Sequence, residues 1–238
     1  MPKHKLLFLM GGMPAWEKVA GYFVRAAGGG SARTVILLPG GLGTIRHLPD
    51  YTGPLRQYGL TGAQGIFPEK SKDLDLARAQ RFIEKADGIL CGGGPTPVYQ
   101  HMFAREPLLT LIRARCESGV PYAGISAGAL IAPAKNVYWE GEVEDKDIRV
   151  FSGLGLAEGF IVDVHFTEWH RLPRILEAMA KTGILYGWGV DEGACAVFRD
   201  GRFAGIIGRG VYRIEMTSLK TKKYKIAEAI KEFKERMV

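Results

Sequence analysis

Short apolar runs alternate with segments of helical periodicity over the first 130 residues. Each run is rich in aliphatic residues and ends at glycine or another turn residue, which is typical of strands buried on both faces of a parallel sheet. The predicted strands are 6–10, 34–38, 88–91 and 122–125, and the predicted helices are 16–27, 74–86 and 98–117. This alternation predicts an α/β fold, an open and mostly parallel sheet with helices on both faces. Active sites in such folds lie at the carboxyl ends of the strands.

The pattern changes from about residue 186 onward. Short runs at 194–198, 203–207 and 211–215 are separated by Asp200-Gly201 and Gly208-Arg209-Gly210, which indicates a hairpin or meander. We expect these runs to form an antiparallel edge of the same sheet.

The last segment has a basic, weakly amphipathic pattern. Ile226, Ile230 and Phe233 recur at helical spacing with charges between them, which favours a terminal helix docked by one face. Residues 1–238 are therefore expected to form a single α/β domain that ends in a basic C-terminal helix.

Composition fits an ordinary folded protein: 238 residues, of which 47% are hydrophobic and 24% charged. The formal net charge is +7, and the segment 217–238 alone holds seven basic and three acidic residues. The rest of the chain carries only a small excess of positive charge and has no recognisable nucleic-acid motif. We therefore expect no nucleic-acid partner.

The cysteines and the N-terminal residues indicate in which cellular compartment the protein is expected. Cys91, Cys116 and Cys195 are odd in number and lack CxxC spacing, so neither a disulfide framework nor a zinc knuckle is indicated. The apolar run at 6–10 is too short for a secretory signal, and no run reaches the roughly 18 apolar residues of a membrane span. These features favour a cytoplasmic protein without a membrane partner.

The segment Gly124-Ile125-Ser126-Ala127-Gly128 has the G-x-S-x-G pattern directly after a predicted buried strand. In a nucleophile elbow, small flanking residues allow a strained turn that exposes the serine Oγ and aims the next backbone N–H at an oxyanion. A tight strand-to-helix turn without a catalytic role is the alternative.

A nucleophilic serine needs a base, and the base needs an orienting carboxylate. His165 ends the apolar run 160–164, a position where strands deliver catalytic side chains, although a lone histidine is often structural. His170 is expected to be a solvated residue or a helix cap. The candidate acids are Asp163, Asp191 and Glu192, the last two in a glycine-bounded segment. The acidic stretch 140–147 is expected to form a surface loop or a lid.

Five segments in register carry a resemblance to a known family. They are Cys91-Gly92-Gly93-Gly94, Gly124-Ile125-Ser126-Ala127-Gly128-Ala129, Gly153-Leu154-Gly155-Leu156, Val162-Asp163-Val164-His165-Phe166 and Gly189-Val190-Asp191-Glu192. Together they resemble the cyanophycinase and dipeptidase E family of serine peptidases, from the first strand to about residue 200.

The resemblance implies a class I glutamine-amidotransferase-like fold with serine as the nucleophile. Carried over by position, the cyanophycinase branch implies Ser126 as nucleophile, His165 as general base and Glu192 as the orienting acid. The dipeptidase E branch places its acid soon after the serine, so an acid in 140–147 is the alternative that the resemblance leaves open. The oxyanion hole would take one backbone N–H from the glycines at 92–94, with Gly93 preferred, and one from Ala127. The chain order Ser, His, Glu differs from the order in α/β-hydrolases, which disfavours an ordinary esterase.

At some positions that would contact the substrate, the sequence differs from the pattern of the family. Val164 replaces the glutamine that cyanophycinases typically carry before the histidine, and Pro95-Thr96-Pro97 replaces a substrate-contacting glutamine. Arg171 and Arg174 do match family arginines and, with Asp163, are candidates for substrate binding; a guanidinium can grip a carboxylate through a bidentate fork. Exposed charges on the following helix are the alternative reading of the two arginines.

These observations converge on a serine hydrolase of small peptides, with aspartyl or isoaspartyl linkages as the substrate class the resemblance implies. The alternative is a catalytically idle family member that binds a small ligand or a partner in the same cleft. We expect no metal, because the residues 165–170 fit no zinc-binding spacing, and no cofactor, because phosphate-binding loops are missing from the sequence. The resemblance makes a homodimer plausible.

Overall fold

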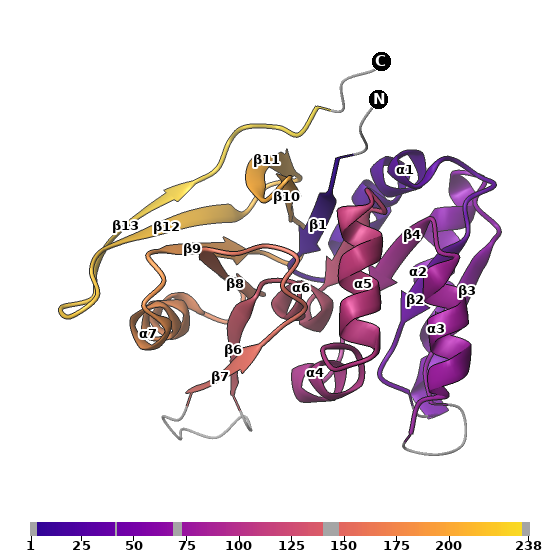
Figure 1. Ribbon diagram of the computed structural model, residues 1–238. Coiled ribbons are helices and arrows are strands. Elements are labelled where there is room, and N and C mark those ends of the chain that lie inside the picture. Colours follow the sequence, from indigo (N-terminus) through magenta and orange to yellow (C-terminus); the bar gives the residue numbers. More distant parts are fainter. Residues whose placement is uncertain (1–3, 41, 69–72, 140–147, 235–238) are drawn as a thin grey trace.

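The computed structural model describes residues 4–40, 42–68, 73–139 and 148–234. Within them, seven strands form one sheet in the order β11-β10-β1-β5-β4-β2-β3, parallel from β1 to β3 (Figure 1). Their bounds are β1 (Leu6–Met10), β2 (Thr34–Leu37), β3 (Ala63–Ile66), β4 (Gly88–Cys91), β5 (Tyr122–Ile125), β10 (Cys195–Arg199) and β11 (Arg202–Ile207). The expected α/β class and open, mostly parallel sheet are confirmed.

Helices cover both faces of this sheet. One apolar cluster joins α1 (Trp16–Ala27) and α2 (Leu42–Gln57) to side chains of one face, such as Phe8 and Ile36. The other face, with Leu7 and Leu9, packs against α3 (Leu76–Glu84), α4 (Thr96–Phe103), α5 (Leu108–Glu117) and α6 (Ala127–Ile131). Successive residues of a strand point to opposite faces, which explains why these strands are apolar at every position.

Local signals explain where the prediction of helices succeeded and where it did not. The helix at 16–27 is confirmed, and Asp75 caps α3 by accepting a hydrogen bond from the Arg78 N–H at 2.9 Å. The helix predicted at 98–117 is instead two helices, α4 and α5, and Pro107 is the N-cap residue of the second. Helix α2 was not predicted, since it contains Pro49 and Pro54, which lack an N–H for the helical ladder.

A second sheet stands beside the first and was not predicted as a separate unit. Its order is β13-β12-β9-β8, with bounds β8 (Phe160–Val164), β9 (Tyr186–Val190), β12 (Val211–Ser218) and β13 (Lys223–Glu228). The hairpin β6 (Lys135–Trp139) and β7 (Ile148–Ser152) and the helix α7 (Leu172–Thr182) pack beside it, and a short 3-10 turn, η1 (Met13–Ala15), precedes α1. Strands β10 and β11 do form the predicted antiparallel edge of the large sheet, but the run 211–215 belongs to the second sheet.

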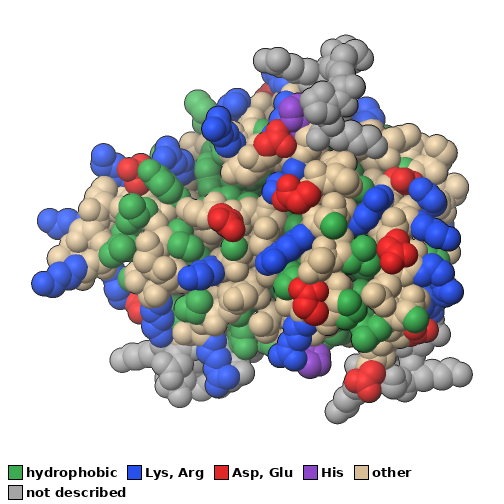
Figure 2. Space-filling view, viewed as in Figure 1, with side chains coloured by type: hydrophobic (Ala, Val, Ile, Leu, Met, Phe, Trp, Pro, Cys, Tyr) green, Lys and Arg blue, Asp and Glu red, His purple; other side chains and the backbone are tan. Residues whose placement is uncertain are grey.

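The predicted C-terminal helix is wrong. Residues 223–228 form β13, which pairs with β12 in antiparallel register, Ile226 opposite Ile214. All six residues of β13 are exposed, so the apolar spacing that suggested a helix has no core to face there, and backbone pairing with β12 decides the conformation. Lys220, Lys222, Lys223 and Lys225 therefore belong to the β12–β13 region, where Figure 2 shows basic side chains at the projecting left end.

Aromatic rings join the two sheets. Phe160 of β8 stacks on Phe198 of β10 with ring centroids 4.5 Å apart, and Trp188 of β9 stacks on Phe203 of β11 at 4.3 Å. Phe198 also meets Trp188 edge-on at 5.6 Å, so it touches both partners from the second sheet. Among the described residues, no helix has the length and apolar character needed to cross a membrane.

The substitution Phe198→Ala should lower the free energy of unfolding by about 3–5 kcal/mol, because it opens a cavity between the sheets. Urea denaturation measures this loss. Tyr224→Ala removes an aromatic ring that is 40% exposed and should change stability far less. Equal losses in the two variants would contradict the role of Phe198 in joining the sheets.

Candidate active site

Ser126 lies in the turn between β5 and α6. Its backbone has φ 51° and ψ −109°, a conformation that costs a non-glycine residue free energy and is typical of functional turns. Its N–H donates to the Met10 carbonyl at 3.0 Å, which ties the turn to the end of β1. A Cβ at Gly128 would lie 2.2 Å from the Cys91 carbonyl oxygen, so only glycine fits at this position of the motif. The local geometry is that of a nucleophile elbow.

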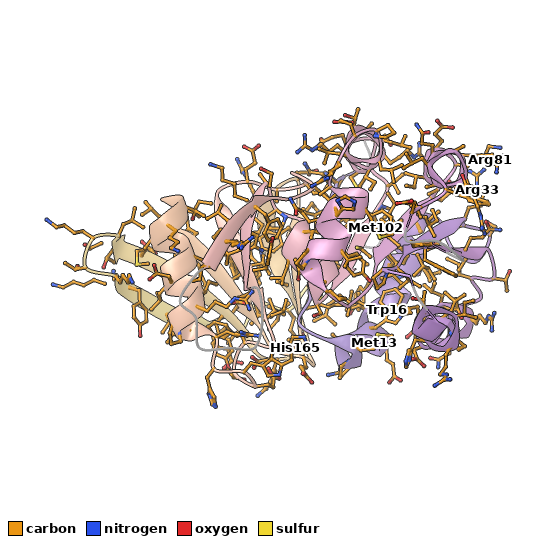
Figure 3. All side chains as sticks on the ribbon, turned by 90° about the horizontal axis from the view of Figure 1, so that it is seen from below. Met13, Trp16, Arg33, Arg81, Met102 and His165 are labelled. Atoms are coloured by element: carbon orange, nitrogen blue, oxygen red, sulfur yellow. The ribbon has the colours of Figure 1, made fainter. Side chains whose placement is uncertain are left out.

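His165 follows β8 and faces Ser126. Its φ is also positive, at 49°, and its Nε2 lies 2.9 Å from Ser126 Oγ. The imidazole is largely buried, with 13% of its side chain exposed. Figure 3 labels His165 near the boundary between the part of the molecule that carries the second sheet and the part built on the large sheet.

Glu192 completes a chain of hydrogen bonds. It follows β9, and its Oε1 lies 2.7 Å from His165 Nδ1. Because an ionised carboxylate only accepts, the proton sits on Nδ1, and Nε2 is free to accept from the Ser126 hydroxyl. Of the other candidate acids, Asp191 Oδ1 accepts from the Thr167 N–H at 2.8 Å, and Asp163 pairs with Arg174.

Two hydrogen bonds from backbone N–H groups to carboxylates hold the histidine turn against the acid turn. The Glu192 N–H donates to Glu168 Oε1 at 3.0 Å, complementing the Thr167 to Asp191 bond described above. On the other side, a Cβ at Gly12 would lie 3.0 Å from the Glu192 Cβ, so the end of β1 packs closely on this residue. The position of Glu192 is thus fixed from both sheets.

Trp169 is a site residue that the sequence reasoning missed. Its indole stacks on the His165 ring with centroids 4.0 Å apart and an interplanar angle of 16°, although 54% of the residue is exposed. The Arg171 guanidinium lies over the same indole, 4.7 Å from the ring centroid. The signal available in the sequence was a tryptophan four residues after the histidine.

Arg171, Arg174 and Asp163 meet behind the histidine. Arg174 Nε lies 3.4 Å from Asp163 Oδ2, and both side chains are more than nine-tenths buried. Burial raises the pKa of Asp163, and the positive charge of Arg174 opposes that shift. Burial also lowers the pKa of Arg171, which is half-buried. Arg174 is therefore part of a buried ion pair and not the exposed charge considered as an alternative.

A cleft of about 460 Å³ lies in front of the serine and the histidine. Ser126, His165, Trp169 and the two arginines line it, together with Pro95, Thr96, Pro97 and Tyr138. The segment that replaces the family's glutamine therefore forms a wall of the same cleft. Residues 140–147, which the sequence suggested as a lid or as a source of an acid, lie outside the described residues.

The two backbone amides expected for the oxyanion hole differ in their surroundings. Ala127 N–H follows Ser126 directly and has no acceptor among the described residues. Gly93 lies close enough that a Cβ on it would be 3.6 Å from the Ser126 Cβ, but its N–H already donates to Tyr51 Oη at 3.3 Å. Gly93 as an oxyanion donor stays a prediction, and its N–H would have to leave the Tyr51 hydroxyl to act as one.

The cysteines are poor candidates for the nucleophile. Cys91, Cys116 and Cys195 are buried and free, and burial raises the pKa of the Cys91 thiol to about 12. A thiol with so high a pKa is not a thiolate near neutral pH. Among the described residues, no cluster of three or more His, Cys, Asp or Glu side chains is arranged to hold a metal ion.

Fold and geometry together define an α/β protein with a serine-centred site between two sheets, and sequence comparison names the family. Residues 7–206 match the model of peptidase family S51, so the chain belongs to that family. Cyanophycinase from Geminocystis herdmanii is 32% identical over 57% of this chain and 51% of its own length. Peptidase E from Shewanella amazonensis is 31% identical over 56% of this chain and 58% of its own. The chain thus spans about half the length of the curated relatives it matches.

Solved structures show the same fold. A peptidase from an acI-B1 actinobacterium superposes with a TM-score of 0.70 at 19% identity, covering 97% of this chain and 98% of the other. A putative peptidase E protein from Listeria monocytogenes EGD-e gives a TM-score of 0.58 at 16% identity, covering 84% and 96%.

The buried ion pair generates a stability prediction. Asp163→Asn keeps the shape of the side chain but leaves the Arg174 guanidinium buried without its counter-ion, so the free energy of unfolding should fall by about 3–5 kcal/mol. Adding Arg174→Met removes the stranded charge and should recover much of that loss. Urea unfolding at neutral pH measures both, with Asp87→Asn at the exposed Arg33 pair as the control. A loss no larger than that of the control would show that burial does not make this pair important.

Proposed function

We propose that the chain is a serine peptidase in which Ser126, His165 and Glu192 act as a catalytic triad. The observation that carries this proposal is the unbroken chain of two hydrogen bonds, Ser126 Oγ to His165 Nε2 at 2.9 Å and His165 Nδ1 to Glu192 Oε1 at 2.7 Å. Membership of family S51 supports it independently.

The proposed mechanism follows from these contacts. His165 Nε2 takes the Ser126 proton as Oγ attacks the scissile carbonyl carbon, and the Glu192 carboxylate stabilises the imidazolium that forms. The tetrahedral intermediate collapses when His165 gives this proton to the leaving amine, which breaks the peptide bond and leaves an acyl ester on Ser126. Water, deprotonated by His165, then attacks the ester. His165 gives this proton to Ser126 Oγ as the ester bond breaks, which releases the acid and restores the serine.

We propose short peptides with a carboxylate near the scissile bond as substrates, including aspartyl and isoaspartyl linkages. Two guanidinium groups border the cleft beside His165, and Asp163 neutralises one of them, which leaves one positive charge to attract an anion. The names of the relatives, cyanophycinase and peptidase E, agree with the hydrolysis of peptide bonds. Val164 and the proline-bounded segment at 95–97 argue for a substrate other than cyanophycin itself.

The cellular compartment of the protein is also part of the proposal. Three buried, unpaired cysteines fit a reducing compartment, and we propose the cytoplasm. The expectation of a homodimer stays a prediction.

The test is a hydrolysis panel with Asp-X dipeptides, β-Asp-Arg, β-Asp-Lys and a neutral dipeptide. The wild type should cleave at least one of the acidic substrates and prefer it to the neutral one. Ser126→Ala should lower kcat/KM on that substrate by about 10⁴-fold or more, because no other group replaces the nucleophile. Released amine is measured by liquid chromatography.

Ser31→Ala, which removes an exposed hydroxyl away from the cleft, is the matched control and should retain full activity. Undiminished cleavage by folded Ser126→Ala would refute the triad. A folded wild type that cleaves no peptide but binds one in the cleft would favour the idle binding module.

A further inference from the structure

Two tyrosine hydroxyls hold the glycine turn that follows β4. Tyr51 comes from α2 and Tyr99 from α4, on opposite faces of the large sheet. The Gly93 N–H donates to Tyr51 Oη at 3.3 Å, and Tyr99 Oη donates to the Gly93 carbonyl oxygen at 2.9 Å. Tyr99 is fully buried and Tyr51 is 9% exposed. The triad proposed above uses neither hydroxyl.

The bond from Tyr99 fixes a peptide plane. The Gly93 carbonyl shares its peptide group with the Gly94 nitrogen, and in a trans peptide the C=O and N–H point in opposite directions. Since the carbonyl points at a buried tyrosine, the Gly94 N–H points away from the core. Gly94 and Ser126 line the same cleft, and the Gly94 N–H has no acceptor among the described residues.

The glycine turn needs such a restraint. Gly94 has φ 145°, and glycine has access to more backbone conformations than other residues. Rotation of the 93–94 peptide would turn a carbonyl, with its negative end, toward the position where an oxyanion forms. The Tyr99 hydrogen bond opposes this rotation, because the buried carbonyl would lose its donor. Tyr51 meanwhile keeps the Gly93 N–H directed at its own hydroxyl.

We propose that Tyr99 is a positioning residue that aims the Gly94 N–H, in place of the Gly93 N–H, at the oxyanion beside the Ala127 N–H. This inference rests on the proposed function, since it needs an oxyanion on a carbonyl attacked by Ser126. Tyr99 acts only through the peptide that it orients, and it does not touch the substrate. A donor that binds the oxyanion acts in the transition state, so its misplacement lowers kcat more than it raises KM.

The test compares Tyr99→Phe with Tyr122→Phe. Tyr122 is also fully buried, and its hydroxyl donates to the Gly128 carbonyl at 2.8 Å, so the two variants lose matched hydrogen bonds. A fluorophosphonate probe is suitable because its P=O oxygen occupies the oxyanion position and no peptide substrate has to be known. Tyr99→Phe should react with the probe between about tenfold and a hundredfold more slowly than Tyr122→Phe, at similar thermal stability. On a cleaved dipeptide the loss should appear in kcat, with KM little changed.

A labelling rate of folded Tyr99→Phe equal to that of the wild type would overturn the role of Tyr99 while leaving the triad intact. Absence of labelling in the wild type would instead refute the proposed function. A crystal structure of the labelled wild type decides the donor without any variant. A P=O oxygen within hydrogen-bond distance of the Gly94 and Ala127 nitrogens supports the inference, and one bound to the Gly93 nitrogen overturns it.

Discussion

The hydrogen bond between Ser126 and His165 is the contact on which the site depends, because it bridges two separate sheets. Ser126 follows β5 of the large sheet, whereas His165 and Glu192 follow β8 and β9 of the second sheet. Both Ser126 and His165 adopt positive φ, which costs about 1–3 kcal/mol at each residue. The strain persists because the surrounding structure fixes both turns, and any rotation of one sheet against the other would separate the two side chains.

Aromatic packing between the sheets opposes that rotation, and polar contacts hold each turn within its own half of the site. The rings of Phe160 and Phe198 stack between the sheets, and the Ser126 N–H is anchored to β1. The paired bonds between the histidine turn and the acid turn keep His165 and Glu192 together, and the ion pair of Asp163 and Arg174 lies buried beneath them. Packing and polar contacts outside the site therefore set the relative positions of Ser126, His165 and Glu192, which a catalytic site must hold to within about 0.5 Å.

The elements that could be predicted from the sequence are those whose residues show a clear local pattern. Apolar runs gave β1, β4 and β5 with their observed bounds, because strands buried on both faces need no tertiary information to be recognised. Helix α2 was missed, since its prolines contradict local propensity and its burial against α1 overrides them. The tail was misassigned because three apolar residues at helical spacing cannot outweigh an available strand edge, which only the folded β12 supplies. The division of the strands into two sheets depends on pairing between segments far apart in the sequence, so no local pattern indicates it.

Within the site, too, residues marked by local motifs could be predicted, whereas residues placed by long-range contacts could not. Motif and strand-end position marked Ser126 and His165 and left three acids open, among which the family resemblance favoured Glu192. The structure brings Ser126, His165 and Glu192 into one hydrogen-bonded chain. Tyr51 and Tyr99 could not be predicted, because their hydroxyls reach the glycine turn from two helices on opposite faces of the sheet. The orientation of a single peptide, and hence the choice between Gly93 and Gly94 as donor, is invisible in a sequence of three consecutive glycines.

The mass and the attachment site of a covalent adduct show most directly whether Ser126 is a nucleophile activated by His165. Wild-type protein treated with a fluorophosphonate is measured by intact mass and then by peptide mapping. The expected result is one phosphonyl group per chain, attached to Ser126, with none on folded His165→Ala. Attachment at another residue, or no adduct on folded wild-type protein, would contradict the claim that Ser126 is a nucleophile activated by His165.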